Sequence, residues 1–201
     1  MPVARVYLEV GHKSVFAVAL DWPGWCRRTK TSDLAIDELE RYRSRYEAMV
    51  TGTFSPGPID VIGTTTGNGT TDFGAPGAEG PWDEQPLAAS EVSRQVALLE
   101  DCWRYFDAVV DAAPLELRKG PKGGGRNRDA IADHVREAER AYSSKIGSRV
   151  PPRTPWVEQR AIVIAALGAG APGSAWPLGY AIRRFAWHVT DHAWEIEDKS
   201  A

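Results

Sequence analysis

The stretch LGYAIRRFAWHVTDHAWEIED, residues 178–198, carries apolar side chains at the spacing of an amphipathic α-helix. They recur every three or four residues, which places them on one helix face, and they are Leu178, Ile182, Phe185, Val189, Ala193 and Ile196. Pro177 precedes them and suits a first helical turn, because a proline there gives up no hydrogen bond. The stretch therefore predicts a helix that begins near residue 177 and faces a core.

Two more helices are predicted earlier in the chain. The first ends at Pro114, which cannot continue a helix, and its apolar stripe consists of Val92, Val96, Leu99, Trp103, Phe106 and Val110. The second begins after Asn127 or Asp129, since either side chain can cap a helix N-terminus, and it ends at Gly147. Its stripe consists of Ile131, Val135, Ala138, Tyr142 and Ile146. Each helix therefore has one face that a neighbour must cover.

A further helix is predicted at residues 156–167, where the sequence is apolar nearly all round. A helix without a polar face belongs in an interior, so we expect it to be the most buried of the set. Four helices of this size joined by loops predict a helical bundle over residues 86–198.

The N-terminal residues carry a β-type pattern. Residues 5–20 alternate apolar and polar side chains around a polar turn, which predicts a hairpin. A third short strand is expected at residues 26–29, and Thr31 suits the cap of a helix over residues 34–50. Residues 1–50 therefore predict a small ββα unit.

The two parts are joined by residues 51–85, which are rich in Gly, Thr and Pro. This composition is typical of a loop or linker, although residues 59–62 can add one short strand. The predicted fold class is therefore α+β, with a ββα unit over residues 1–50, a linker, and a four-helix bundle over residues 86–198.

Composition and charge exclude several classes of protein. Lys and Arg number 24 against 27 Asp and Glu, a net charge of −3, so no nucleic-acid partner is expected. The chain has no N-terminal signal pattern, and its most apolar run, residues 161–171, is too short to span a bilayer. Cys26 and Cys102 make no disulfide framework, as expected in a reducing compartment. We therefore predict a cytoplasmic protein without a membrane partner.

Three of the four histidines fall on two of the predicted helices. His188 and His192 are four residues apart, so they lie on one helix face about 6 Å from each other, and His134 lies on the inward side of the second helix. Three imidazoles suit Zn, Ni or Fe and leave coordination positions open for water or substrate. We predict that they hold a divalent metal ion; histidines that only pack in a core are the alternative. His12, in the hairpin turn, is assigned no function.

Charged residues near the histidines complete the predicted site. A carboxylate can orient a metal-bound imidazole through its second N–H, and those within a turn of the histidines are Asp133, Glu137, Asp191 and Glu195. On spacing, Glu137 is the nearest candidate for a catalytic acid or base. The loop at residues 118–128 carries five basic residues and several glycines before a helix N-terminus, where anions bind readily. Arg126 and Arg128 are the candidates for binding a substrate anion; a solvated loop without a ligand is the alternative.

The segments RRFAWHVTDHAWEIED (residues 183–198) and DHVREAE (residues 133–139) resemble those of the DinB/YfiT-like superfamily of metalloenzymes. The resemblance covers residues 86–198 and implies a four-helix bundle with a triad of histidine ligands from two helices. The ligands that it implies are His134, His188 and His192. It also implies a reaction that uses a low-molecular-weight bacterial thiol such as mycothiol or bacillithiol, and a composition compatible with a high-GC organism favours mycothiol.

The segment FAVALDWPGWC (residues 16–26), with the helix after it, is similar to HicB-like domains, in which a strand ends in a Pro-Gly turn before a helix. This resemblance implies a fold for residues 5–50 and does not by itself make the protein an antitoxin.

Together these features predict a metal-dependent transferase or hydrolase that acts on a small anionic molecule. A non-catalytic module that binds a metal or ligand and regulates a partner is the alternative, and a purely structural bundle is a third interpretation. The sequence leaves dimerisation through exposed tryptophan side chains open.

Overall fold

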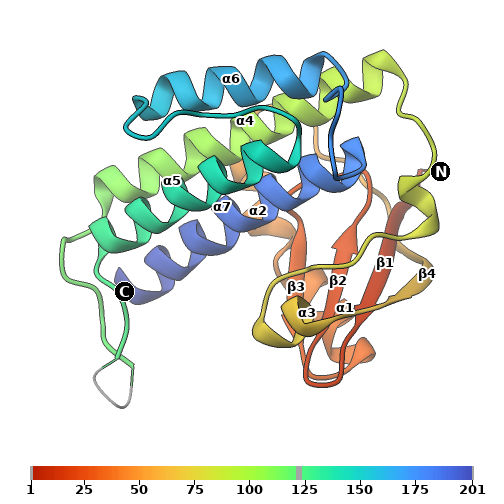
Figure 1. Cartoon of the computed structure of the whole chain (residues 1–201). Coiled ribbons are helices and arrows are strands. Elements are labelled where there is room, and N and C mark those ends of the chain that lie inside the picture. The colour runs from red at the N-terminus through yellow and green to blue at the C-terminus, as the bar shows by residue number, and fades with distance from the viewer. Residues whose placement is uncertain (1, 121–123, 201) are drawn as a thin grey trace.

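The chain folds into a four-stranded sheet covered by helices, an α+β architecture (Figure 1). The computed structural model describes residues 2–120 and 124–200. The strands lie in the order β3-β2-β1-β4 and are β1 (Ala4–Val10), β2 (Val15–Ala19), β3 (Cys26–Thr29) and β4 (Ile59–Thr66). β2 is antiparallel to β1 and β3, whereas β4 runs parallel to β1. The predicted α+β class is confirmed.

The predicted hairpin forms from two strands that are largely buried. All five residues of β2 are buried, and they pair with residues 6–10 of β1. The N–H of Gly11 donates to the carbonyl of Ser14 across the turn, at 2.9 Å. β3 occupies the residues predicted for a third strand. Side chains of both faces of the sheet are buried in apolar clusters, in keeping with the need of a buried sheet for a layer on each face.

Helices α1 (Ser32–Arg41) and α2 (Arg43–Met49) form one of these layers. Thr31 caps α1 as predicted, since its side chain accepts a hydrogen bond from a backbone N–H of the first turn. The single helix expected here is divided at Tyr42, whose ring packs against Trp194 with 4.8 Å between centroids. The division therefore coincides with a contact to a residue distant in sequence.

The segment at residues 51–85, expected to be a linker, is built into the fold. It contains β4, the short helix α3 (Gly69–Phe73) and the 3-10 helix η1 (Pro81–Asp83). β4 is eight residues long, twice the expected strand, and pairs with β1 along its length. As an edge strand it exposes many of its side chains, so the apolar alternation that reveals a strand in sequence is weak. The interpretation of this segment as a loop is corrected accordingly.

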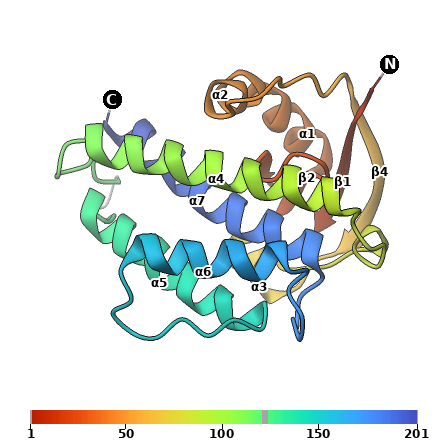
Figure 2. The same cartoon turned by 90° about the horizontal axis from the view of Figure 1, so that it is seen from above.

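Four long helices pack beside the sheet, namely α4 (Ala89–Ala112), α5 (Arg128–Lys145), α6 (Trp156–Gly168) and α7 (Leu178–Ser200). Figure 2 shows α4 and α7 between the sheet layer and the outer helices α5 and α6. The central helix is α7, in which 15 of 23 residues are buried. The stripes predicted for α4, α5 and α7 supply many of their buried positions, which confirms these three helices and their orientation.

The expectation that α6 is the most buried helix is wrong. Only Gln159, Val163 and Leu167 are buried, while Val157 is 77% exposed. α6 packs on α4 and α5 at the edge of the bundle, and single apolar side chains are common on protein surfaces. Neither α6 nor any other helix in the described part of the chain is long and apolar enough to cross a membrane.

Ion pairs and a shared core join the sheet and α2 to α7. Arg27 of β3 pairs with Asp191 at 3.1 Å, and Arg45 of α2 pairs with Glu197 at 2.6 Å. One apolar core extends from the sheet into the bundle. Side chains on α7 can therefore form sites both with α5 and with the sheet.

Replacing Asn127 by alanine destabilises the protein by about 1 kcal/mol, the usual contribution of a helix N-cap. The sequence allowed Asn127 or Asp129 as the cap, and the structure selects Asn127, whose Oδ1 accepts the N–H of Ala130 at 2.9 Å. Asp129→Ala is the control and loses less, because Asp129 contributes only to the helix dipole and to an exposed ion pair with Arg128. Urea unfolding measures both; a larger loss for Asp129→Ala contradicts the assignment.

Candidate metal centre

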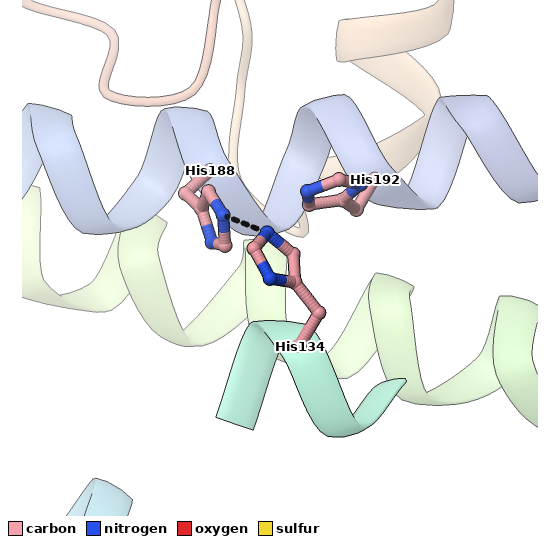
Figure 3. A group of neighbouring side chains, drawn as sticks. All are labelled: His134, His188 and His192. Carbon is pink, nitrogen blue, oxygen red and sulfur yellow. Dashed lines mark hydrogen bonds between the residues drawn. The ribbon is translucent and has the colours of Figure 1, made fainter. Parts of the chain in front are cut away.

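His134 of α5 and the pair His188 and His192 of α7 converge on one point (Figure 3). One nitrogen from each ring lies within 4.8 Å of the other two, and the ring centroids are 4.7 to 5.1 Å apart. The helix itself aligns His188 and His192, which are one turn apart. α5 supplies the third ring because it packs against α7. The three histidines singled out in the sequence are therefore neighbours.

The spacing of two of the three nitrogens suits a tetrahedral metal site. Nε2 of His188 and Nε2 of His134 are 3.3 Å apart. Metal–nitrogen bonds of about 2.0–2.1 Å at a tetrahedral angle of about 109° separate two ligand nitrogens by about 3.3–3.4 Å. A hydrogen bond between the His188 and His134 rings would have a similar length. Such a bond alone does not explain why the His192 ring also lies close to both. One pair of nitrogens therefore has the separation of two ligands of one ion, and the third, within 4.8 Å of them, would have to move closer to complete the site.

Burial keeps two of the rings in the neutral form that binds metal. His188 is 6% exposed, and burial together with the adjacent His192 and His134 rings lowers its pKa well below the usual value. Burial and the nearby Arg126 guanidinium also lower the pKa of His134. The lowered pKa values therefore favour the neutral, metal-binding form of both rings.

Glu195 orients the third ring. Its Oε2 lies 2.7 Å from Nδ1 of His192, and its Oε1 accepts a hydrogen bond from Nζ of Lys199 at 2.5 Å. The contact with His192 and then that with Lys199 lower the pKa of Glu195 to about 2, although burial opposes them. Glu195 is therefore ionised and accepts the N–H of Nδ1. This arrangement leaves Nε2 of His192 available for a metal ion.

Aromatic side chains enclose His188. The ring of Tyr142 packs edge-on against it at 5.6 Å, and the ring of Trp187 lies at 5.8 Å. Nδ1 of His188 is buried and has no hydrogen-bond partner among the described residues, so packing rather than hydrogen bonding fixes this side of the ring. His134 and His192 are only partly buried, and the site opens on their side.

Glu137, the predicted acid or base, does not take the position next to the triad that Glu195 occupies. Its side chain is 60% exposed and pairs with Arg140 at 2.6 Å. Glu137 follows His134 by three residues just as Glu195 follows His192, so spacing alone treats the two carboxylates alike. The packing of α5 against α7 distinguishes them, and the prediction of Glu137 as the catalytic acid or base finds no support in this geometry.

The two predicted anion-binding arginines have different surroundings. Arg128 donates to the carbonyl of Ala113 at 2.9 Å and pairs with Asp129 at 2.8 Å, so its guanidinium holds the start of α5 in place. Arg126 is exposed and forms no hydrogen bond or ion pair with the residues in the described ranges. Its charge nevertheless contributes to lowering the pKa of His134 and, as a smaller cause, that of His188. Residues 121–123 of the same basic loop lie outside the described residues.

The candidate centre thus consists of three imidazoles, one orienting carboxylate and one guanidinium nearby. Spacing in the sequence predicts the three histidines. It also gives four carboxylates near them, but it does not distinguish Glu195 from the other three. The resemblance to DinB/YfiT-like and HicB-like proteins stays a prediction from sequence. Comparison of the chain with protein-family models, with curated proteins and with solved structures gave no match.

Proposed function

We propose that the triad holds a divalent metal ion and that the protein is a metal-dependent transferase or hydrolase acting on a small anionic molecule. The observation that carries the proposal is the approach of three imidazole nitrogens to within 4.8 Å of one another. Two helices separated by more than 30 residues supply them, and a carboxylate orients one ring, as is common around metal-bound histidines. Zn, Ni and Fe all accept such a donor set.

The chain's own residues would hold and orient this ion. It would supply Lewis acidity to an oxygen or sulfur group of a substrate. His188 is fixed by burial, His192 by its contact with Glu195, and His134 reaches across from α5. Since neutral imidazoles leave the charge of the ion uncompensated, an anionic ligand is favoured at the open position.

Arg126 supports an anionic substrate. Its exposed guanidinium immediately precedes the N-cap of α5, and a helix N-terminus with an adjacent cation suits a carboxylate or phosphate. On the sequence resemblance alone, we extend the proposal to a low-molecular-weight thiol such as mycothiol as the second reactant.

The metal-free protein is expected to take up one equivalent of Co(II), with the visible absorption of a low-coordinate site. Glu195→Gln removes the carboxylate that orients His192 and weakens Co(II) binding about 10- to 100-fold, as outer-shell substitutions do. Glu137→Gln is the matched control, a carboxylate at the same spacing from a histidine, and leaves the affinity unchanged. Competition with a chromophoric chelator measures the three affinities.

Two results count against the proposal. If the wild-type protein takes up no stoichiometric Co(II), Zn(II), Ni(II) or Fe(II), the triad is not a metal centre. If both glutamate variants bind Co(II) as tightly as the wild type, Glu195 does not orient a ligand.

A further inference from the structure

A cleft separate from the three histidine rings lies between α7 and the edge strand β3. It is a cleft of about 240 Å³, and five of the nine residues that line it are charged. The charged residues are Arg27, Arg28, Asp191, Glu195 and Asp198. Aromatic rings, including those of Trp187 and Trp194, provide the apolar part of its wall. The cleft therefore combines both signs of charge with aromatic surface.

Some charged side chains in the cleft form ion pairs, whereas Arg28 forms none within the described part of the chain. Asp191 pairs with Arg27 at 3.1 Å, and Asp198 pairs with Arg45 at 2.9 Å. Arg28, by contrast, makes no hydrogen bond or ion pair with any residue that the structure describes. A guanidinium is a fork of donors that fits a carboxylate, whereas each aspartate keeps lone pairs for a further donor. The cleft thus contains the Arg28 guanidinium, which forms no ion pair with the described residues, and carboxylates that can accept further hydrogen bonds.

The backbone reserves space for the Arg28 side chain. Gly74 ends α3 in the left-handed conformation, with φ of 119°. A Cβ at this position would lie 2.1 Å from Nη1 of Arg28, so any other residue would displace the guanidinium as well as strain the turn. Arg28 also pairs in register with Phe16 of β2, which directs both side chains to the same face of the sheet. Strand β3 and the turn at Gly74 therefore bring the exposed Arg28 side chain beside the cleft.

We propose that this cleft binds a small zwitterion with one carboxylate and one ammonium group, the chemical class of a free α-amino acid. The carboxylate pairs with Arg28, and the ammonium group pairs with the acidic side formed by Asp191 and Asp198. The volume lies below the roughly 300–1,000 Å³ of pockets for drug-sized ligands, which suits a single amino acid. The rings of Trp187 and Trp194, 6% and 1% exposed, line the wall beside it.

The cleft and the metal centre share one side chain. Glu195 lines the cleft and also contacts Nδ1 of His192 at 2.7 Å. The Glu195 carboxylate therefore lies between a zwitterion bound in the cleft and the histidine triad. Its use as a substrate rests on the proposed function, whereas its binding does not.

The test is a titration of the ¹⁵N-labelled full-length protein with L-leucine, followed through the indole N–H signals. We expect saturable shifts for Trp187 and Trp194 with a Kd on the order of 1 mM, and none for Trp156 on α6. Leucinamide lacks the carboxylate and N-acetyl-leucine lacks the ammonium group, so each is expected to bind about tenfold more weakly.

Arg28→Gln keeps the length of the side chain, removes its charge and is expected to weaken L-leucine binding about tenfold. It leaves the affinity for leucinamide unchanged. The matched control is Arg41→Gln on α1, where the side chain is 78% exposed and pairs only with Glu38 among the described residues. This variant binds L-leucine like the wild type.

The titrations are made on both the Zn(II)-loaded protein, in which the ion is diamagnetic, and the chelator-treated protein. L-leucine binding in the chelator-treated form supports the cleft even if the triad takes up no metal, in which case only the proposed function fails. The cleft proposal is overturned if L-leucine causes no saturable shift in either form, if Arg28→Gln binds it as tightly as the wild type, or if leucinamide binds equally well.

Discussion

Replacing His188 by alanine weakens the binding of divalent metal by a factor of about 100 or more. Structural zinc sites bind with about 10–16 kcal/mol shared among four ligands, so one ligand accounts for about 3 kcal/mol, or a factor of about 150. His188 is also the most buried of the triad and lies 3.3 Å from the nitrogen of His134. Elemental analysis of the purified protein and competition with a chelator measure the loss.

The control for this variant is His12→Ala. His12 is the fourth histidine and lies exposed in the turn between β1 and β2, so its removal leaves the metal content unchanged. His188→Asn, a polar replacement, repeats the test should the alanine variant fold poorly. A His188 variant that folds and retains the wild-type metal affinity refutes the triad, as does an equal loss in the His12 variant.

Replacing Asp83 by alanine destabilises the protein by about 3–5 kcal/mol, the cost of leaving one partner of a buried ion pair alone. Asp83 of η1 pairs with Arg183 of α7, and the two side chains are only 2% and 6% exposed. Beyond Asp83, the Arg183 guanidinium has the Tyr7 side chain as its neighbour. The variant therefore releases the segment before α4 from the central helix. Chemical denaturation measures the free energy of unfolding.

Two controls separate the buried charge from a simple packing effect. The double variant Asp83→Leu with Arg183→Met removes both charges, and we expect it to recover most of the lost stability, because an apolar pair of similar volume often replaces a buried ion pair without cost. Glu38→Ala breaks the exposed pair with Arg41 and costs less than about 1 kcal/mol. If Asp83→Ala costs no more than Glu38→Ala, this ion pair does not hold the segment.

Local periodicity accounts for what could be predicted of this fold. The stripe through Phe185 and Val189 marks α7, and the pattern around the first turn marks the hairpin, because both reflect which side of one element is buried. The pair of His188 and His192 belongs to the same class of signal, since one helical turn places them together. The cap at Asn127 likewise depends only on adjacent residues.

The sequence by itself determined the principal helices, the hairpin and three histidines directed at a common interior. The tertiary structure alone decided that β4 completes the sheet, that α7 rather than α6 is central, and that Glu195 rather than Glu137 accompanies the triad. It alone also formed the cleft beside Arg28. The physical reason is that spacing along a chain fixes which residues share a face, whereas which face meets which neighbour depends on contacts between segments far apart in sequence.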